Sequence, residues 1–282
     1  MKGTQMRREI LLKYLLGSFT IKRLFFSVVF IYFSCALIGC AISNSMMFFP
    51  PARKYSLEPE MVMIETPGGE KICAYHFLNP DAEFTIIYSH GNAEDIAQNR
   101  PVFERFVERG FSVLAYDYRG YGLSEGRPTE KNTYEDIEAA YSFLTENAGV
   151  SPDKIIPYGR SIGGGPAVYL ASRKQVAGVI LQSAFTSAYR VMTHIPILPF
   201  DKYNNLARIK KINRPVLIMH GTEDTIVKPW HGRKLFETAN EPKLKLWVEN
   251  TGHNEDIAAK ADKNYWKAIE TFIDEVKKAE KD

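Results

Sequence analysis

The sequence has little cysteine and no strong excess of charge of either sign. Of its 282 residues three are cysteines, and Cys35 and Cys40 share one apolar stretch, so Cys73 has no disulfide partner in the rest of the chain. The formal net charge is +3, but residues 1–39 hold six Lys or Arg against one Glu, and the remaining residues hold 30 basic against 32 acidic side chains. The chain therefore lacks the concentrated positive surface that a nucleic-acid partner requires, and we expect no such partner.

Internal repeats and low-complexity tracts are also lacking. With 24% charged, 45% hydrophobic and 12% aromatic residues, the composition is that of an ordinary globular protein of one or two domains. A disordered or collagen-like chain is excluded.

The N-terminal part contains one apolar run, residues 24–38, directly after the basic pair Lys22 and Arg23. Such a run behind positive charges is typical of a targeting segment, and the charge bias places the rest of the chain outside the cytoplasm. Extended to Ile42 the run has 19 residues, just enough to span ~30 Å of hydrocarbon. Residues 1–39 are therefore predicted to be a signal peptide or an uncleaved signal anchor.

The end of this run, Leu37-Ile38-Gly39-Cys40, resembles the lipobox of bacterial lipoproteins. The resemblance implies that Cys40 becomes the lipidated N-terminus of a membrane-attached protein of the bacterial cell envelope. The signal anchor remains the alternative. Residues 40–60 form a lipidated or membrane-proximal tether, whose apolar residues 46–49 are expected to pack on the domain that follows.

Residues 61–282 are predicted to form one domain. Apolar runs predict strands at 61–66, 72–78, 84–88, 112–116, 154–158, 178–181, 215–219 and 243–248. Helical periodicity predicts helices at 94–109, 134–147, 162–173, 230–238 and 261–278. Two opening strands without a helix between them, followed by alternation, predict an α/β fold with an antiparallel N-terminal edge and a doubly wound, mostly parallel sheet.

The segment Gly159-Arg160-Ser161-Ile162-Gly163 directly follows a predicted strand and opens a predicted helix. In that context G-x-S-x-G is typical of a nucleophile elbow, a turn so sharp that its flanking positions must be glycine. We therefore predict Ser161 as a nucleophile.

A serine nucleophile needs an imidazole base and a carboxylate that orients the imidazole. Asp224 and His253 each follow the end of a predicted strand, and the order Ser, Asp, His is the chain order of α/β-hydrolases. We predict these three residues to be a catalytic triad. The competing candidates are Glu223, Asp256 and His231.

An oxyanion site would complete this chemistry. Its backbone N–H donors are predicted to be those of Asn92, after the third strand, and Ile162, with Ala93 as the alternative to Asn92. His90 and His220 are interpreted as structural, since neither has the spacing of a metal ligand. No metal and no cofactor are expected.

These residues give the chain a resemblance to α/β-hydrolases of the serine aminopeptidase and monoacylglycerol lipase-like group over Met61 to Val276. The segments most similar to the eukaryotic membrane-associated depalmitoylating thioesterases of that group are YSHGNAEDI, YDYRGYGLSEG, YGRSIGGGP, PFDKYNN, IMHGTEDTIV and WVENTGHNE. The resemblance implies that Asp117, Arg119 and Gly120 hold loops near the site by hydrogen bonds. The export-type N-terminus departs from those relatives.

The stretch 184–214 is predicted to be a short lid. Its apolar residues form an open acyl groove or merely cover the sheet edge: Phe185, Tyr189, Ile195, Ile197, Leu198 and Phe200. We expect a monomeric serine hydrolase that cleaves esters or thioesters of a small-molecule or lipid-like acyl substrate through an acyl-enzyme. The alternatives are a serine aminopeptidase and a catalytically idle envelope scaffold.

Overall fold

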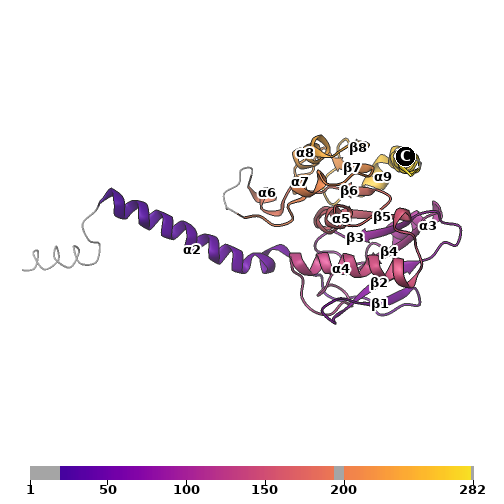
Figure 1. The fold of residues 1–282 in the computed structure, drawn as a ribbon, viewed down its shortest axis with the longest axis horizontal. Helices are drawn as coiled ribbons and strands as arrows, with labels where there is room; N and C mark the ends of the chain where they lie inside the picture. Colours follow the sequence, from indigo (N-terminus) through magenta and orange to yellow (C-terminus); the bar gives the residue numbers. More distant parts are fainter. Residues whose placement is uncertain (1–19, 194–199, 281–282) are drawn as a thin grey trace, which may run out of the picture. The chain divides into compact units, whose positions relative to one another are not determined.

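The computed structural model describes residues 20–193 and 200–280 (Figure 1). The chain divides into two compact units, Met1–Met47 and Phe48–Asp282. The residues 48–60, assigned to the tether, thus fall in the second unit together with the body.

The described part of the first unit is the helix α2, Ile21–Met47, which contains the predicted apolar run. Within the residues that the structure describes, no helix is both long enough and apolar enough to cross a membrane. Residues 1–19 lie outside the described part of the chain. The signal peptide, the signal anchor and the lipidation of Cys40 stay predictions.

The second unit is built on one eight-stranded sheet with the order β1-β2-β4-β3-β5-β6-β7-β8. The strands are β1 (Met61–Glu65), β2 (Lys71–Phe77), β3 (Thr85–Ser89), β4 (Ser112–Tyr116), β5 (Ile155–Arg160), β6 (Val179–Gln182), β7 (Val216–Gly221) and β8 (Lys243–Val248). The pairs β1–β2 and β2–β4 are antiparallel, and every other pair is parallel. This confirms the predicted α/β fold with an antiparallel N-terminal edge.

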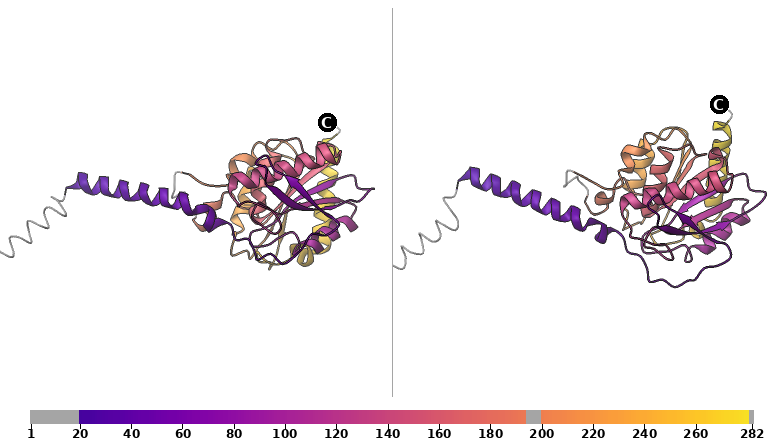
Figure 2. Two further views of the ribbon diagram at one scale, coloured as in Figure 1. Left: turned by 90° about the horizontal axis from the view of Figure 1, so that it is seen from below. Right: turned by 60° about the horizontal axis from the view of Figure 1, so that its bottom comes forward.

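Helices pack on the sheet in two groups (Figure 2). The larger ones are α3 (Arg100–Glu108), α4 (Glu130–Ser142), α5 (Gly164–Ala171), α8 (Trp230–Thr238) and α10 (Lys263–Ala279), and the short α9 (Ile257–Ala261) precedes α10. Phe106 of α3 meets Trp266 of α10 edge to face at 5.3 Å between ring centroids, while Tyr134 of α4 stacks on Tyr169 of α5 at 4.0 Å. Burial of β3, β4 and β7 along their whole lengths explains why these strands read as continuous apolar runs.

Two helix starts differ from the prediction by four or more residues. The first helix after β3 begins at Arg100 and not at residue 94, because the Ile96 N–H donates to Asp117 Oδ1 (3.0 Å) and so leaves the helical path. α4 begins four residues earlier than predicted, since the hydroxyl of Thr129 accepts the Asn132 N–H (3.0 Å) as an N-cap. A π-helical turn, Phe143–Asn147, continues α4 to the predicted end.

The predicted lid region contains two short helices, α6 (Ala188–Met192) and α7 (Asn205–Ile209). Phe185 is buried, with its ring 6.1 Å from that of Tyr203, so it belongs to the core and does not line an open groove. Tyr189 and Phe200 pack edge to face at 6.2 Å. The other three apolar residues proposed for the groove lie outside the described residues, and they are Ile195, Ile197 and Leu198.

Candidate active site

The candidate nucleophile, Ser161, stands at the turn between β5 and the 3-10 turn Ser161–Gly163 that leads into α5. Its φ of 52° lies in the left-handed region, which costs a non-glycine residue about 1–3 kcal/mol and is characteristic of functional sites. The turn is closed so tightly that a Cβ at Gly159 would overlap the carbonyl of Gly163, and a Cβ at Gly163 would overlap the carbonyl of Ser89. Both flanking glycines of the motif are therefore required sterically.

The structure brings the three predicted triad residues together in one chain of hydrogen bonds. His253 Nε2 lies 3.0 Å from Ser161 Oγ, and His253 Nδ1 lies 2.6 Å from Asp224 Oδ2. Both distances are within the reach that proton transfer and orientation of the imidazole require. The arrangement can activate the serine hydroxyl, since an Nδ1–H donated to Asp224 leaves Nε2 as the acceptor.

Asp224 is held by its own loop as well as by His253. Its Oδ1 accepts the N–H groups of Ile226 (3.0 Å) and Val227 (2.8 Å). Burial opposes ionisation of this carboxyl group, but the hydrogen bonds and positive charge of His220 and His253 outweigh it and hold the pKa of Asp224 well below its usual range. Asp224 is therefore a fixed anionic acceptor.

His220 is a neighbour of this carboxylate that the sequence reasoning treated only as structural. Its Nε2 donates to the carbonyl of Val227 (2.7 Å) and lies 3.3 Å from Asp224 Oδ2. A signal for this contact was present, since His220 is the second-last residue of β7 and lies four residues before Asp224. His220 thus helps to hold the loop 224–227 in place.

The competing candidates occupy other places. Asp256 caps α9 by accepting the Ala258 N–H (2.9 Å), and it pairs with Arg105 (2.8 Å). His231 Nδ1 lies 3.0 Å from the hydroxyl of Thr186. Glu223 contributes its backbone N–H to the carbonyl of Thr251 (3.0 Å). None of their described contacts reaches Ser161.

A partly buried ion pair connects three loops of the site and was not found from the sequence. Arg160 donates to Glu94 Oε1 (2.6 Å) and to the carbonyl of His253 (3.2 Å). The same Glu94 oxygen accepts the Gly91 N–H. Burial disfavours the charge on Arg160, but Glu94 outweighs this and raises the pKa of the guanidinium. The nucleophile turn, the loop after β3 and the histidine loop are thus held to one another.

The predicted oxyanion residues lie beside the serine turn. Ile162 is in the first turn of a helix, where backbone N–H groups have no acceptor within the helix. Ala93, the alternative donor, has a φ of 58° and directs its N–H to Asn92 Oδ1 (3.1 Å). The Ala93 N–H thus already has an acceptor, and the donor role of Asn92 and Ile162 stays a prediction.

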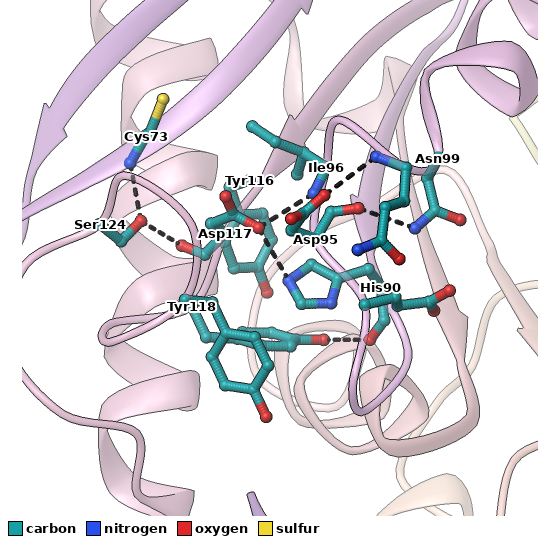
Figure 3. A network of polar contacts seen from close by, with 12 residues as sticks. Cys73, His90, Asp95, Ile96, Asn99, Tyr116, Asp117, Tyr118 and Ser124 are labelled. Atoms are coloured by element: carbon teal, nitrogen blue, oxygen red, sulfur yellow. Dashed lines mark hydrogen bonds and ion pairs between the residues drawn. The ribbon is translucent and has the colours of Figure 1, made fainter. Parts of the chain in front are cut away.

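The loop that carries Asn92 rests on a buried polar network (Figure 3). His90 Nε2 lies 3.3 Å from Asp117 Oδ1, and Tyr118 donates its hydroxyl to the His90 carbonyl (2.6 Å). Burial alone would lower the pKa of His90, but Asp117 outweighs it and raises that pKa. Arg119 anchors the next loop through Asp136 (2.6 Å). Asp117 and Arg119 thus hold loops, as the resemblance implied.

Across residues 20–193 and 200–280, no three or more His, Cys, Asp or Glu side chains are grouped so that they could hold a metal ion.

Comparison with known proteins gives consistent results. Residues 80–200 match the model of the family described as serine aminopeptidase, S33. The chain is 44% identical to the human α/β-hydrolase domain-containing protein 17B over 200 residues, which cover 70% of this chain and 69% of the relative. It is 41% identical over 204 residues to protein 17C of Xenopus tropicalis, covering 71% of this chain and 65% of the relative.

Solved structures show the same fold at lower sequence identity. An esterase of Pyrococcus furiosus superposes with a TM-score of 0.66 at 22% identity, over 80% of this chain and 98% of the esterase. An esterase of a Rhodococcus species gives a TM-score of 0.61 at 18% identity, over 77% of this chain and 99% of the esterase.

Proposed function

Because the chain belongs to the α/β-hydrolase domain-containing protein 17 family and is a hydrolase, we propose that it cleaves carboxylic esters or thioesters through an acyl-enzyme on Ser161. The observation that carries the proposal is the hydrogen-bonded chain from Asp224 through His253 to Ser161. The same three side chains at the ends of three strands would have no use in an idle scaffold.

The geometry supports a two-step reaction. Ser161 Oγ attacks the acyl carbonyl carbon while His253 Nε2 takes the hydroxyl proton, and the carbonyl oxygen becomes an oxyanion held by the N–H groups of Asn92 and Ile162. The intermediate collapses, the bond to the alcohol or thiol breaks, and His253 returns the proton to the leaving group. A water then attacks the acyl-enzyme with His253 again as base, which releases the carboxylic acid and restores Ser161.

Location is the second part of the proposal. Cys40 is lipidated after removal of residues 1–39, and the domain then works on acyl groups at the membrane to which it is attached, outside the cytoplasm. The apolar run, the Leu37-Ile38-Gly39-Cys40 motif and the resemblance to membrane-associated thioesterases support it.

The decisive experiment uses the nucleophile. Ser161→Ala should abolish labelling by a fluorophosphonate probe and lower hydrolysis by roughly 10⁴-fold or more, as loss of a triad nucleophile does. The full-length protein and this variant are tested on acyl esters, acyl thioesters and aminoacyl amides. Equal labelling of the two proteins would refute the assignment of Ser161, and turnover of the aminoacyl amides alone would establish the aminopeptidase alternative.

A further inference from the structure

The segment that follows α2, residues 48–58, bonds to the loop that carries the proposed oxyanion donor. Phe48 is buried, and the next N–H, that of Phe49, donates to Asn92 Oδ1 (2.9 Å) and lies 3.1 Å from the Tyr121 hydroxyl. Tyr121 itself donates to Asn92 Oδ1 (2.7 Å). The three groups close a small ring around the Asn92 side chain.

A second contact holds the far end of the same loop. The hydroxyl of Tyr55 donates to Asp117 Oδ2 and accepts the N–H of Leu123 (3.2 Å). The other oxygen of Asp117 accepts the Ile96 N–H (3.0 Å) and faces His90. Burial, reinforced by the charge of Asp117, raises the pKa of Tyr55 well above its usual range, so this hydroxyl stays a donor. Residues 48–58 thus contact the loop 90–96 directly at Asn92 and support its far end through Asp117.

This loop needs such support for two reasons. It has no helix or strand of its own between β3 and α3, and Ala93 holds a positive φ of 58° within it. An oxyanion donor must lie 2.7–3.1 Å from the developing charge, and a displacement of about 1 Å can cost on the order of 10²-fold in rate. The position of the Asn92 N–H therefore depends on what holds the loop.

We propose that residues 48–58 are a positioning element for the oxyanion site, with Phe49 acting through Asn92 and Tyr55 acting through Asp117. The inference rests on the proposed function, because it presumes that Asn92 supplies an oxyanion donor. In this proposal, residues 48–58, which follow α2 in the sequence, also help to position the oxyanion site.

The test uses two full-length variants that each remove one hydroxyl, Tyr121→Phe and Tyr55→Phe. Each should lower kcat for a p-nitrophenyl acyl ester roughly tenfold, because the loop 90–96 is then held less firmly. KM should stay within about twofold of the wild-type value, because the substrate pocket keeps its shape. Each should weaken inhibition by a trifluoromethyl ketone by a similar factor, since its serine adduct carries the same oxyanion.

The matched control is Tyr141→Phe on α4, which removes a hydroxyl that donates to the Gln175 carbonyl (2.9 Å). It should leave kcat and the inhibition constant at their wild-type values. If Tyr121→Phe and Tyr55→Phe only lower Tm or change only KM, the segment contributes packing alone and the inference is wrong.

A double variant separates positioning from general damage. Because Tyr121 acts through the Asn92 side chain, Asn92→Ala combined with Tyr121→Phe should lose no more activity than the more impaired single variant. Multiplied losses would overturn this coupling. An inactive wild-type protein would refute the proposed function, whereas an active wild type with unimpaired variants refutes only the positioning role.

Discussion

At the scale of residues, the charge on Asp224 determines what His253 can do. Two backbone N–H groups and two imidazoles face this carboxylate, which favours its ionised form and keeps a proton on His253 Nδ1. Nε2 is then the acceptor that faces Ser161. The adjacent Glu223 is exposed, whereas Asp224 is buried.

The two acids can be told apart by amide substitutions. Asp224→Asn should lower kcat by about 10⁴-fold, because an amide favours the wrong tautomer of His253, while the neighbouring Glu223→Gln serves as control and should cost little. Steady-state hydrolysis of an acyl ester by both variants gives the ranking. The opposite ranking would show that Glu223 is the acid.

Sequence reasoning reached the residues whose role follows from local context and missed those whose role depends on long-range contact. Ser161, Asp224 and His253 each follow the end of a predicted strand, so a short motif beside an apolar run marks them. Phe49 lies 43 residues from Asn92 and Tyr121 lies 29 residues from it, and nothing local to either signals the contact. The residues that contact the oxyanion loop could therefore be identified only from the folded structure.

At the scale of elements, the strands were predicted closely, but the starts of α3 and α4 were not. Parallel strands buried on both faces are continuous apolar runs, and the first and last apolar residues of a run mark where the strand begins and ends. A helix start depends on where backbone N–H groups find acceptors, and for Ile96 that acceptor is Asp117, 21 residues away. Apolar periodicity carries no information on such a partner.

The burial of β2 gives a prediction for its cysteine. Burial, with a smaller contribution from the charge of Asp117, raises the pKa of Cys73 to about 12. The thiol is thus protonated at pH 8 and shielded, and it should not react with a maleimide in the folded protein but should react once the protein unfolds. Peptide mass spectrometry before and after denaturation measures both. Rapid modification of Cys73 in the folded protein would contradict the burial of β2.

At the scale of the whole molecule, the chain consists of two compact units that meet in the sequence between Met47 and Phe48. α2 ends at Met47, and the next residue, Phe48, is already buried in the second unit. In the proposed lipidated form, Cys40 would lie nine residues before Phe49, whose N–H donates to Asn92 Oδ1.

The lipidation proposal is tested on Cys40. Produced in a bacterial host with an alkyne fatty acid, the wild-type protein should be labelled and lighter by residues 1–39, because the thiol is the proposed acceptor and processing ends at Gly39. Cys40→Ser should remain unlabelled and full length, and Cys35→Ser should behave as wild type. Intact-mass measurement reads out all three. An unlabelled wild type of full length would instead support the signal anchor.

The hydrogen bond from Phe49 to Asn92 sets a limit on reach. An extended chain spans at most ~3.5 Å per residue, so in the proposed lipidated form the oxyanion site lies within about 30 Å of the acylated sulfur of Cys40. With so short a tether, the enzyme would reach only substrates close to the membrane that carries it. Its rate would follow the surface density of substrate in that layer and not the bulk concentration.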